Sequence, residues 1–282
     1  MDDTLRKLQL TELEILEVID RICKKYDIKY SLYAGTLLGA VRHKGFIPWD
    51  DDLDICMSRD QYNRFLKVWI QDSPKGFLLQ NKDNTPTFTQ SFSKIRKDDT
   101  TFFQDGEIAG NYHMGIFVDV FPIDRMPNGK LKRYAFVWRC MKYQLFCREF
   151  VPTQNGRFAK VASDIILKTT TQKFRSKKRQ RLLNRITKYN SEKSNNTVAI
   201  EIKRTFSTPL PPDLMDDYVI LEYEGKGFPC VKKWNEYLRI KFGDYMQYPP
   251  VEEQTWAHPP VMIDFEHNYE DINQNIKAPF VF

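Results

Sequence analysis

Long apolar runs, paired cysteines and a dominant sign of charge are all missing from this 282-residue sequence. The five cysteines are scattered, and none belongs to a Cys-x-x-Cys pair, which disfavours a zinc site or a disulfide framework. No uninterrupted apolar stretch approaches membrane-spanning length, and the first residues are acidic instead of basic and then apolar. We therefore expect a cytoplasmic protein with reduced thiols, no signal peptide and no membrane span.

Neither sign of charge dominates. The chain has 43 Lys and Arg residues against 37 Asp and Glu, so its formal net charge is +6 with both signs mixed. This balance gives a mild attraction to phosphates and does not indicate nucleic-acid binding. The most basic stretch, 173–188, lacks the interleaved aromatic residues that single-strand binding requires. We interpret it as a solvated helix face, with contact to anionic lipid or glycan phosphates as the alternative.

The spacing of apolar residues predicts a chain of mixed helices and strands. Helical spacing indicates helices at 4–26, 60–71, 131–150, 158–193 and 231–242. Alternation or short apolar runs indicate strands at 28–32, 53–57, 77–80, 88–96, 115–121, 198–202 and 218–222. Pro152, Asn155 and Gly156 are typical of a linker at 151–158. We predict a core over 1–150, a basic helical insertion or accessory region over 151–215, and a C-terminal part that completes the core over 216–282.

The strongest chemical signal is a run of acids at Asp50, Asp51, Asp52 and Asp54. Four acids in five positions repel one another unless a cation or strong donors neutralise them. On a strand at 53–57, Asp52 and Asp54 share one face about 6.5–7 Å apart, a spacing that lets both bind a hard cation. This predicts a phosphate-bearing substrate with Mg²⁺ or Mn²⁺. A plain surface turn or a calcium site is the alternative.

A third acid is expected on a neighbouring strand. Asp119 lies in mid-strand between two valines, where a carboxylate without a partner is unfavourable, so it is the best candidate for a third ligand or a base. Asp124 follows Pro122 and is better interpreted as the cap of a turn or of the next helix.

Basic residues flank the acids in sequence. Lys94 and Arg96 alternate on a predicted strand and share a face, which favours contact with phosphate oxygens. Arg42 is suited equally to a phosphate contact or to ordinary surface charge. Gly35 ends the strand at 28–32, and Thr36 can cap the helical segment that follows, so backbone N–H groups there can face a phosphate.

With these residues identified, the stretch from Tyr33 to Ile55 closely resembles the signature of LicD-type phosphotransferases. Further matches are the strand at 92–96, the run Val-Asp-Val-Phe-Pro-Ile-Asp at 118–124, and Phe-Gly-Asp-Tyr-Met at 242–246, which is followed by two prolines and His258. The resemblance is weakest through 125–215.

The resemblance implies an α/β (α+β) fold like that of nucleotidyltransferases, in which helices flank a small mixed sheet, with an additional helical region. It implies that Asp52, Asp54 and Asp119 are catalytic acids that hold Mg²⁺ or Mn²⁺. It also implies transfer of a phospho-alcohol, phosphocholine from CDP-choline first, to a glycan hydroxyl of a teichoic acid or lipopolysaccharide precursor, with release of CMP. Because such acceptors are often lipid-linked, peripheral contact with the inner face of the membrane is expected.

A donor that carries choline predicts an aromatic surface against its quaternary ammonium. Trp49, Tyr245 and Trp256 are the candidates, and core packing is the alternative for each. His258 would be a catalytic acid, a phosphate donor or a simple tail residue, and its place among the substrate-binding residues follows from the resemblance.

Two other functions fit the same residues. A nucleotidyltransferase would attack the α-phosphorus of an NTP, attach NMP and release pyrophosphate, and the same acids would serve it. A non-catalytic scaffold would bind nucleotide or glycan without turnover. Product analysis distinguishes the nucleotidyltransferase, which releases pyrophosphate, from the phosphotransferase, which releases CMP. Tight binding of CDP-choline without turnover would indicate the scaffold.

Overall fold

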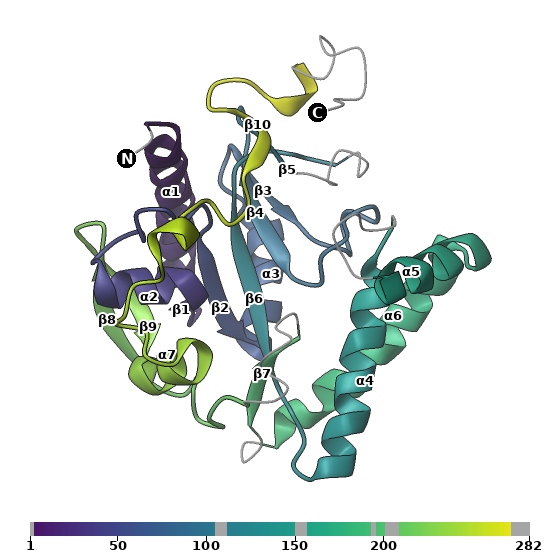
Figure 1. Cartoon of the computed structure of the whole chain (residues 1–282). Coiled ribbons are helices and arrows are strands. Elements are labelled where there is room, and N and C mark those ends of the chain that lie inside the picture. The colour runs from purple at the N-terminus through teal and green to yellow at the C-terminus, as the bar shows by residue number, and fades with distance from the viewer. Residues whose placement is uncertain (1–2, 105–111, 150–156, 193–195, 201–208, 272–282) are drawn as a thin grey trace.

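The computed structural model describes residues 3–104, 112–149, 157–192, 196–200 and 209–271 (Figure 1). The predicted domain boundary at residue 150 and most of the predicted linker lie outside these residues. The helices are α1 (Asp3–Lys25), α2 (Ala34–Arg42), α3 (Arg59–Gln71), α4 (Lys130–Cys147), α5 (Arg157–Thr169), α6 (Gln172–Thr187) and α7 (Trp234–Phe242). The strands are β1 (Ser31–Leu32), β2 (Asp54–Ser58), β3 (Phe77–Gln80), β4 (Ser93–Lys97), β5 (Thr101–Gln104), β6 (Phe117–Arg125), β7 (Thr197–Ala199), β8 (Tyr218–Tyr223), β9 (Lys226–Val231) and β10 (Pro260–Asp264).

The central sheet is mixed, as predicted. Its order is β1-β2-β6-β4-β3, and β7 pairs with the far end of β6. Strands β2 and β6 run parallel, and the other pairs in this sheet are antiparallel. Helices α1 and α3 cover one face of the sheet (Figure 1). The expected α/β fold, a mixed sheet flanked by helices, is confirmed.

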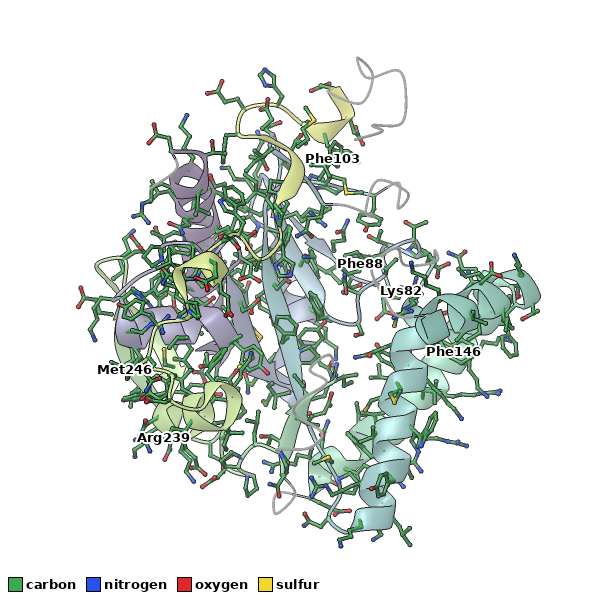
Figure 2. All side chains as sticks on the ribbon, viewed as in Figure 1. Lys82, Phe88, Phe103, Phe146, Arg239 and Met246 are labelled. Atoms are coloured by element: carbon green, nitrogen blue, oxygen red, sulfur yellow. The ribbon has the colours of Figure 1, made fainter. Side chains whose placement is uncertain are left out.

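Local patterns explain the elements that hold this sheet. Helix α1 turns an apolar stripe toward the core, with Leu8, Ile15, Leu16 and Ile19 fully buried. Strand β6 is buried along both faces at its centre, which suits a strand placed between others. Side chains fill the space between sheet and helices (Figure 2), and a smaller hydrophobic cluster contains Phe88, Phe103, Tyr112 and Met114.

Several predicted elements differ from the structure. The strand predicted at 28–32 is reduced to β1 (Ser31–Leu32), and the helix predicted at 131–150 ends at Cys147. The helical pattern at 158–193 is two helices, because the Thr171 side chain accepts a hydrogen bond from the Phe174 N–H and begins α6. The helix predicted at 231–242 begins only at Trp234, since 226–231 form β9 in a hairpin with β8. The strand predicted from residue 88 begins at Ser93. Of the strand predicted at 198–202, the last two residues lie outside the described chain.

Asp124 does not cap a turn or helix as predicted. It is fully buried within β6 and forms a two-point ion pair with Arg59, with N–O distances of 3.0 and 2.5 Å. Asn190 donates a further hydrogen bond of 2.8 Å to it. Removing one partner of such a buried pair costs about 3–5 kcal/mol. Asp124 therefore joins α3, β6 and the end of the helical region.

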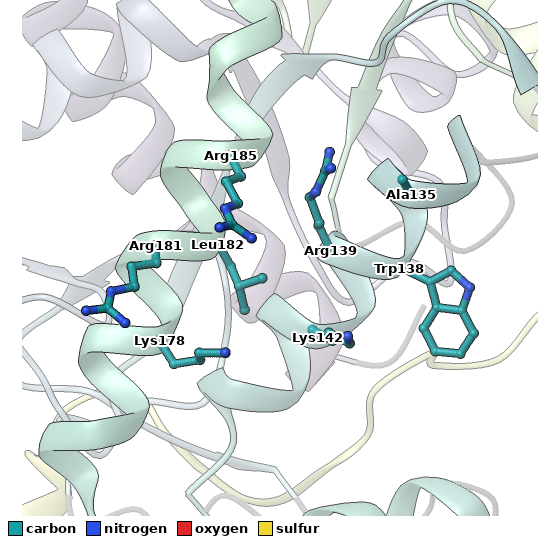
Figure 3. Close-up of a pocket in the computed structure, with 8 residues that line it drawn as sticks. All are labelled: Ala135, Trp138, Arg139, Lys142, Lys178, Arg181, Leu182 and Arg185. Carbon is teal, nitrogen blue, oxygen red and sulfur yellow. The ribbon is translucent and has the colours of Figure 1, made fainter. Parts of the chain in front are cut away.

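Helices α4 and α6 pack against each other and form a second hydrophobic core. Its buried members include Phe136, Cys140, Leu182 and Ile186. A groove of about 380 Å³ lies between the two helices, and Leu182 of this core is part of its lining (Figure 3). Glu149, just after α4, accepts ion pairs of 2.5 Å from both Lys82 and Arg175, and all three are nearly buried. These contacts fix α4 and α6 to the loop that follows β3.

Candidate active site

Three adjacent strands bring two carboxylates and an ammonium group together. Asp54 on β2 is opposite Asp119 on β6, and Asp119 is opposite Lys94 on β4. Residues paired across neighbouring strands point to the same face of the sheet. The Lys94 Nζ lies 2.9 Å from Asp119 Oδ1 and 3.1 Å from the centre of the Phe117 ring. The row Asp54–Asp119–Lys94 is the centre of the candidate site.

Thr36 does not cap the following helix as expected, because α2 already begins at Ala34, with Tyr33 as its N-cap. Gly35 and Thr36 instead lie in the first turn of α2 and fix the start of β2. The Thr36 hydroxyl accepts a hydrogen bond of 2.8 Å from the backbone N–H of Asp54, and the Tyr33 N–H donates to the Asp54 carbonyl at 2.9 Å. A Cβ added to Gly35 would lie 2.7 Å from a carboxylate oxygen of Asp50. Gly35 is therefore required for the close approach of Asp50 to α2, and Thr36 positions Asp54.

The acid run divides into members with different surroundings. Asp51 is buried, and its two oxygens accept hydrogen bonds from the N–H groups of Ala257 at 3.1 Å and His258 at 2.7 Å. Asp52 is partly exposed, and its Oδ2 lies 3.6 Å from His258 Nδ1. Carboxylate oxygens of Asp50, Asp51 and Asp52 come within 4.8 Å of one another. Asp51 thus holds the C-terminal segment, and Asp52 faces the site.

Burial and mutual repulsion disfavour the charged forms of these carboxylates. Burial raises the pKa of Asp54 well above its usual value, and Asp52 and Asp119 raise it further. Burial likewise raises the pKa of Asp50, with Asp52 and Asp51 adding to the effect. Desolvation and the surrounding acids likewise raise the pKa of buried Glu12 on α1. A divalent cation with oxygen ligands would relieve this repulsion, so the residues present fit a Mg²⁺ or Mn²⁺ site.

Lys241 is a member of the site that the sequence did not indicate. It lies in the last turn of α7, with its Nζ 4.7 Å from the centre of the Tyr33 ring. Burial lowers the pKa of its ammonium group, while Asp54 and Asp52 oppose that effect. Its helix was predictable from the apolar pattern, but its electrostatic effect on Asp54 acts across 187 positions of sequence, which no local pattern encodes.

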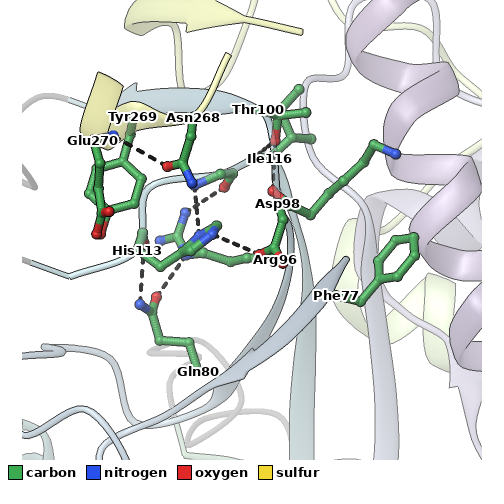
Figure 4. A network of polar contacts seen from close by, with 12 residues as sticks. Phe77, Gln80, Arg96, Asp98, Thr100, His113, Ile116, Asn268, Tyr269 and Glu270 are labelled. Atoms are coloured by element: carbon green, nitrogen blue, oxygen red, sulfur yellow. Dashed lines mark hydrogen bonds and ion pairs between the residues drawn. The ribbon is translucent and has the colours of Figure 1, made fainter. Parts of the chain in front are cut away.

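Arg96 shares a strand with Lys94 but is enclosed by protein. It is fully buried, and its guanidinium donates to the Gln80 side chain at 2.7 Å and to the Gly115 carbonyl at 2.8 Å. Figure 4 shows this network, in which His113 also receives a hydrogen bond from Gln80 at its carbonyl. These surroundings favour a structural role for Arg96 over the phosphate contact expected from its position on the strand.

Arg42 and the candidate aromatic residues gather around a C-terminal loop. Arg42 donates to the carbonyls of Tyr245 and Gln247 at 2.9 and 3.2 Å and lies 4.7 Å from the Tyr248 ring centre. Trp49 packs 6.2 Å from Tyr248. The Tyr245 hydroxyl donates to Asn235, and Trp256 packs against the main core. Among these residues, Trp49 is next to the acid run in sequence.

Comparisons with known proteins identify the family of this chain. The family model described as LicD/FKTN/FKRP, nucleotidyltransferase domain, matches residues 27–165. The lipopolysaccharide cholinephosphotransferase LicD of Haemophilus influenzae is 31% identical over 262 residues, which are 90% of this chain and 96% of that protein. The chain belongs to the LicD family.

LicD membership confirms the transferase class that the resemblance implied. Two uncharacterized proteins of Rickettsia typhi and Rickettsia prowazekii also match, at 36% identity over 75 residues and 49% over 73, each about a quarter of either chain. The LicD model includes Asp52, Asp54, Lys94 and Asp119 but ends before Lys241. Among the residues that the structure describes, no helix is long and apolar enough to cross a membrane.

Proposed function

We propose that this LicD-family transferase moves phosphocholine from CDP-choline to a hydroxyl of a lipopolysaccharide-type glycan and releases CMP. The row Asp54–Asp119–Lys94, with Asp52 beside it, is the observation that carries the proposal. The H. influenzae relative, named as a lipopolysaccharide cholinephosphotransferase, supports the choice of donor group and acceptor. Teichoic acid and the other CDP-alcohols belong to the same proposal as alternative substrates.

Asp52, Asp54 and Asp119 would hold the Mg²⁺ or Mn²⁺ ion, and the ion when bound would neutralise charge on the donor diphosphate. Lys241 supplies positive charge on the Asp54 side of the row, and Lys94 on the Asp119 side. Phosphoryl transfer depends mainly on such positioning and charge neutralisation. Each cation therefore acts on the phosphate oxygens or on the carboxylates that face them.

The transfer itself exchanges one phosphorus–oxygen bond for another. The acceptor hydroxyl oxygen attacks the choline-bearing phosphorus, and the bond from that phosphorus to the bridging oxygen breaks with its electron pair leaving on CMP. The hydroxyl proton passes to a carboxylate of the set, for which Asp119 is our candidate. His258, whose ring nitrogen lies 3.6 Å from Asp52, would donate a hydrogen bond to a donor phosphate.

The choline group requires an aromatic partner, and Trp49 is our candidate. The Tyr248 face already carries the Arg42 guanidinium at 4.7 Å, and a second cation there would be repelled. Trp49 borders this ring and directly precedes the acid run. Alanine at Trp49 should raise the KM for CDP-choline more than that for CDP-glycerol, which has no cation.

The test is CMP release from CDP-choline with and without Mg²⁺, in the presence of lipopolysaccharide-type glycan acceptors. Asp52→Asn and Asp119→Asn should abolish metal-dependent release, while exposed Asp60→Asn on α3 serves as the matched control. Pyrophosphate release from CTP would replace the proposal by the nucleotidyltransferase alternative. Tight CDP-choline binding without turnover under any metal would indicate the scaffold instead.

A further inference from the structure

Helix α4 has a second apolar face that no other described element covers. Its buried face, with Phe136, Cys140, Tyr143 and Cys147, packs in the second core. On the other side, Leu131, Tyr134, Trp138 and Met141 follow one another at intervals of three or four residues and are between 46% and 86% exposed. At 100° per residue these four share one stripe of the helix surface. Such a contiguous exposed apolar stripe is unusual on a soluble surface.

Basic side chains line the groove beside this stripe. Arg139 and Lys142 come from α4, and Lys178, Arg181 and Arg185 come from α6 at intervals of three and four residues. Trp138 belongs both to the stripe and to the groove lining, so the two surfaces are continuous (Figure 3). Phe174, 52% exposed, lies one turn before Lys178 on the same side of α6. The groove is therefore lined by five basic side chains and the exposed Trp138 ring, with exposed Phe174 one turn before Lys178 on α6.

The charge of this surface differs from that of the rest of the molecule. The α4 sequence contains 5 basic residues and the α6 sequence contains 7, and neither helix contains an acid. Because the whole chain carries a formal charge of only +6, the remainder is net negative. A positive surface on an otherwise negative molecule orients it toward an anionic partner.

We propose that α4 and α6 form a docking surface for an anionic phospholipid bilayer. The basic groove binds lipid phosphate groups, and the stripe containing Leu131, Tyr134 and Trp138 enters the interface between headgroups and acyl chains. Cations beside exposed Trp, Tyr and Leu are the combination that interfacial helices use, because aromatic rings suit the headgroup region and lysines and arginines attract anionic lipids. The proposal does not depend on the reaction assigned to the carboxylate site.

The α4–α6 docking surface is connected to the part of the molecule that carries the carboxylate row. The ion pairs of Glu149 with Lys82 and Arg175 connect α4 and α6 to the loop that follows β3, and β7, which comes after α6 in the chain, pairs antiparallel with β6 in the sheet. Helix docking would therefore hold the sheet, and the carboxylate row on it, in one orientation relative to the membrane. A lipid-linked acceptor would then meet a site held at a fixed distance from the membrane surface.

The test is co-sedimentation of the full chain with vesicles of phosphatidylcholine alone and of phosphatidylcholine with an equal part of phosphatidylglycerol. The wild type should bind only the anionic vesicles, and more weakly as salt rises. Lys178→Gln/Arg181→Gln/Arg185→Gln should lower the partition coefficient about 100-fold, at roughly fivefold per residue. Trp138→Ala should lower it about tenfold. A triple variant at exposed Lys29, Lys67 and Lys75 is the matched control and should bind like the wild type.

Unchanged melting temperature and unchanged CMP release from a water-soluble acceptor would show that the groove variants fold. Equal binding by the groove variant and the wild type would overturn the proposal, as would failure of the wild type to bind anionic vesicles. Sedimentation velocity measures whether the protein is a monomer or a dimer. A dimer that dissociates on Trp138→Ala would assign the stripe to a second copy of the chain and refute the lipid surface.

Discussion

Replacement of Asp51 by asparagine should loosen the C-terminal segment without weakening Mn²⁺ binding at the proposed site. Asp51 is buried, and its two oxygens accept hydrogen bonds from the backbone of Ala257 and His258. Asparagine has nearly the same shape but offers only one acceptor oxygen, and its amide group would face the other N–H. One hydrogen bond is lost, and the other is no longer made to a charged group.

The size of the effect follows from these two bonds. A hydrogen bond to a charged acceptor contributes about 1.5–3 kcal/mol. Part of this loss is offset, because Asp50 and Asp52 no longer lie beside a third negative charge. We expect the free energy of unfolding to fall by about 1–2 kcal/mol, a decrease in Tm of roughly 2–8 °C for a chain of this size. Local opening of the segment should become roughly 30-fold more frequent, at about 2 kcal/mol.

Three measurements on Asp51→Asn test this reasoning. Calorimetry gives the change in Tm, hydrogen exchange reports the protection of the Ala257 and His258 amides, and Mn²⁺ titration gives the metal affinity. Asp52→Asn is the comparison, and it should lose metal affinity with these amides still protected. If Asp51→Asn abolished Mn²⁺ binding and left both amides protected, Asp51 would be a metal ligand, and the division of roles within the acid run would be wrong.

Four further results are expected. Lys241→Met should lower kcat/KM for CMP release about 100-fold, or roughly 2.7 kcal/mol, because Asp54 and the donor phosphates lose a cation; Lys241→Arg should restore part of it. Arg96→Met should lower the free energy of unfolding by roughly 2–3 kcal/mol in denaturant titrations, since two buried acceptors lose their donor, with KM unchanged. Burial acts to raise the pKa of Glu224, but hydrogen bonds from Arg6 and the Phe46 N–H outweigh it and hold the pKa below its ordinary 4.5. The advantage in stability over Glu224→Gln should therefore be present above pH 4.5 and disappear as the pH falls through the lowered pKa. The five buried cysteines should react with a thiol reagent only after unfolding.

Each of these results has a contrary outcome. Full turnover by Lys241→Met would remove the lysine from the site, and a raised KM in a stable Arg96→Met protein would restore the phosphate role. A difference between wild type and Glu224→Gln that is constant from pH 7 to pH 3 would show that the ion pair with Arg6 does not contribute. Rapid labelling of any thiol in the native protein would indicate local opening.

The parts of the structure predicted correctly are those with a local signal. Helix α1 and strand β2 carry their apolar patterns in adjacent residues, and Asp119 stands out because it interrupts a run of buried apolar residues. The position of Asp119 opposite Asp54 follows once both strands enter one sheet. These features depend on periodicity and on the cost of burying charge, and both can be read from the sequence.

The parts that sequence could not supply depend on contacts between distant segments. Lys241 approaches Asp54 only because α7 packs beside α2, and Arg96 is enclosed only because Gln80 and Gly115 meet it from other strands. Within the acid run, Asp51 differs from Asp52 because it accepts hydrogen bonds from the backbone of Ala257 and His258 in the C-terminal segment. The exposed stripe of α4 shares the spacing of an ordinary core helix, so the sequence pattern alone cannot show that a second face is uncovered.

The Asp51 contacts also bear on the order in which the chain is made. Ala257 and His258 follow Asp51 by 206 and 207 residues, so the acid run leaves the ribosome long before either amide is synthesised. Throughout that interval, water must solvate the Asp51 carboxylate, and Lys241 is also absent from Asp54. The central strands can assemble early, but Asp51 and Asp54 meet their C-terminal partners only near the end of translation. In a nascent chain the central sheet can therefore form while the carboxylates of the candidate site are still exposed to water.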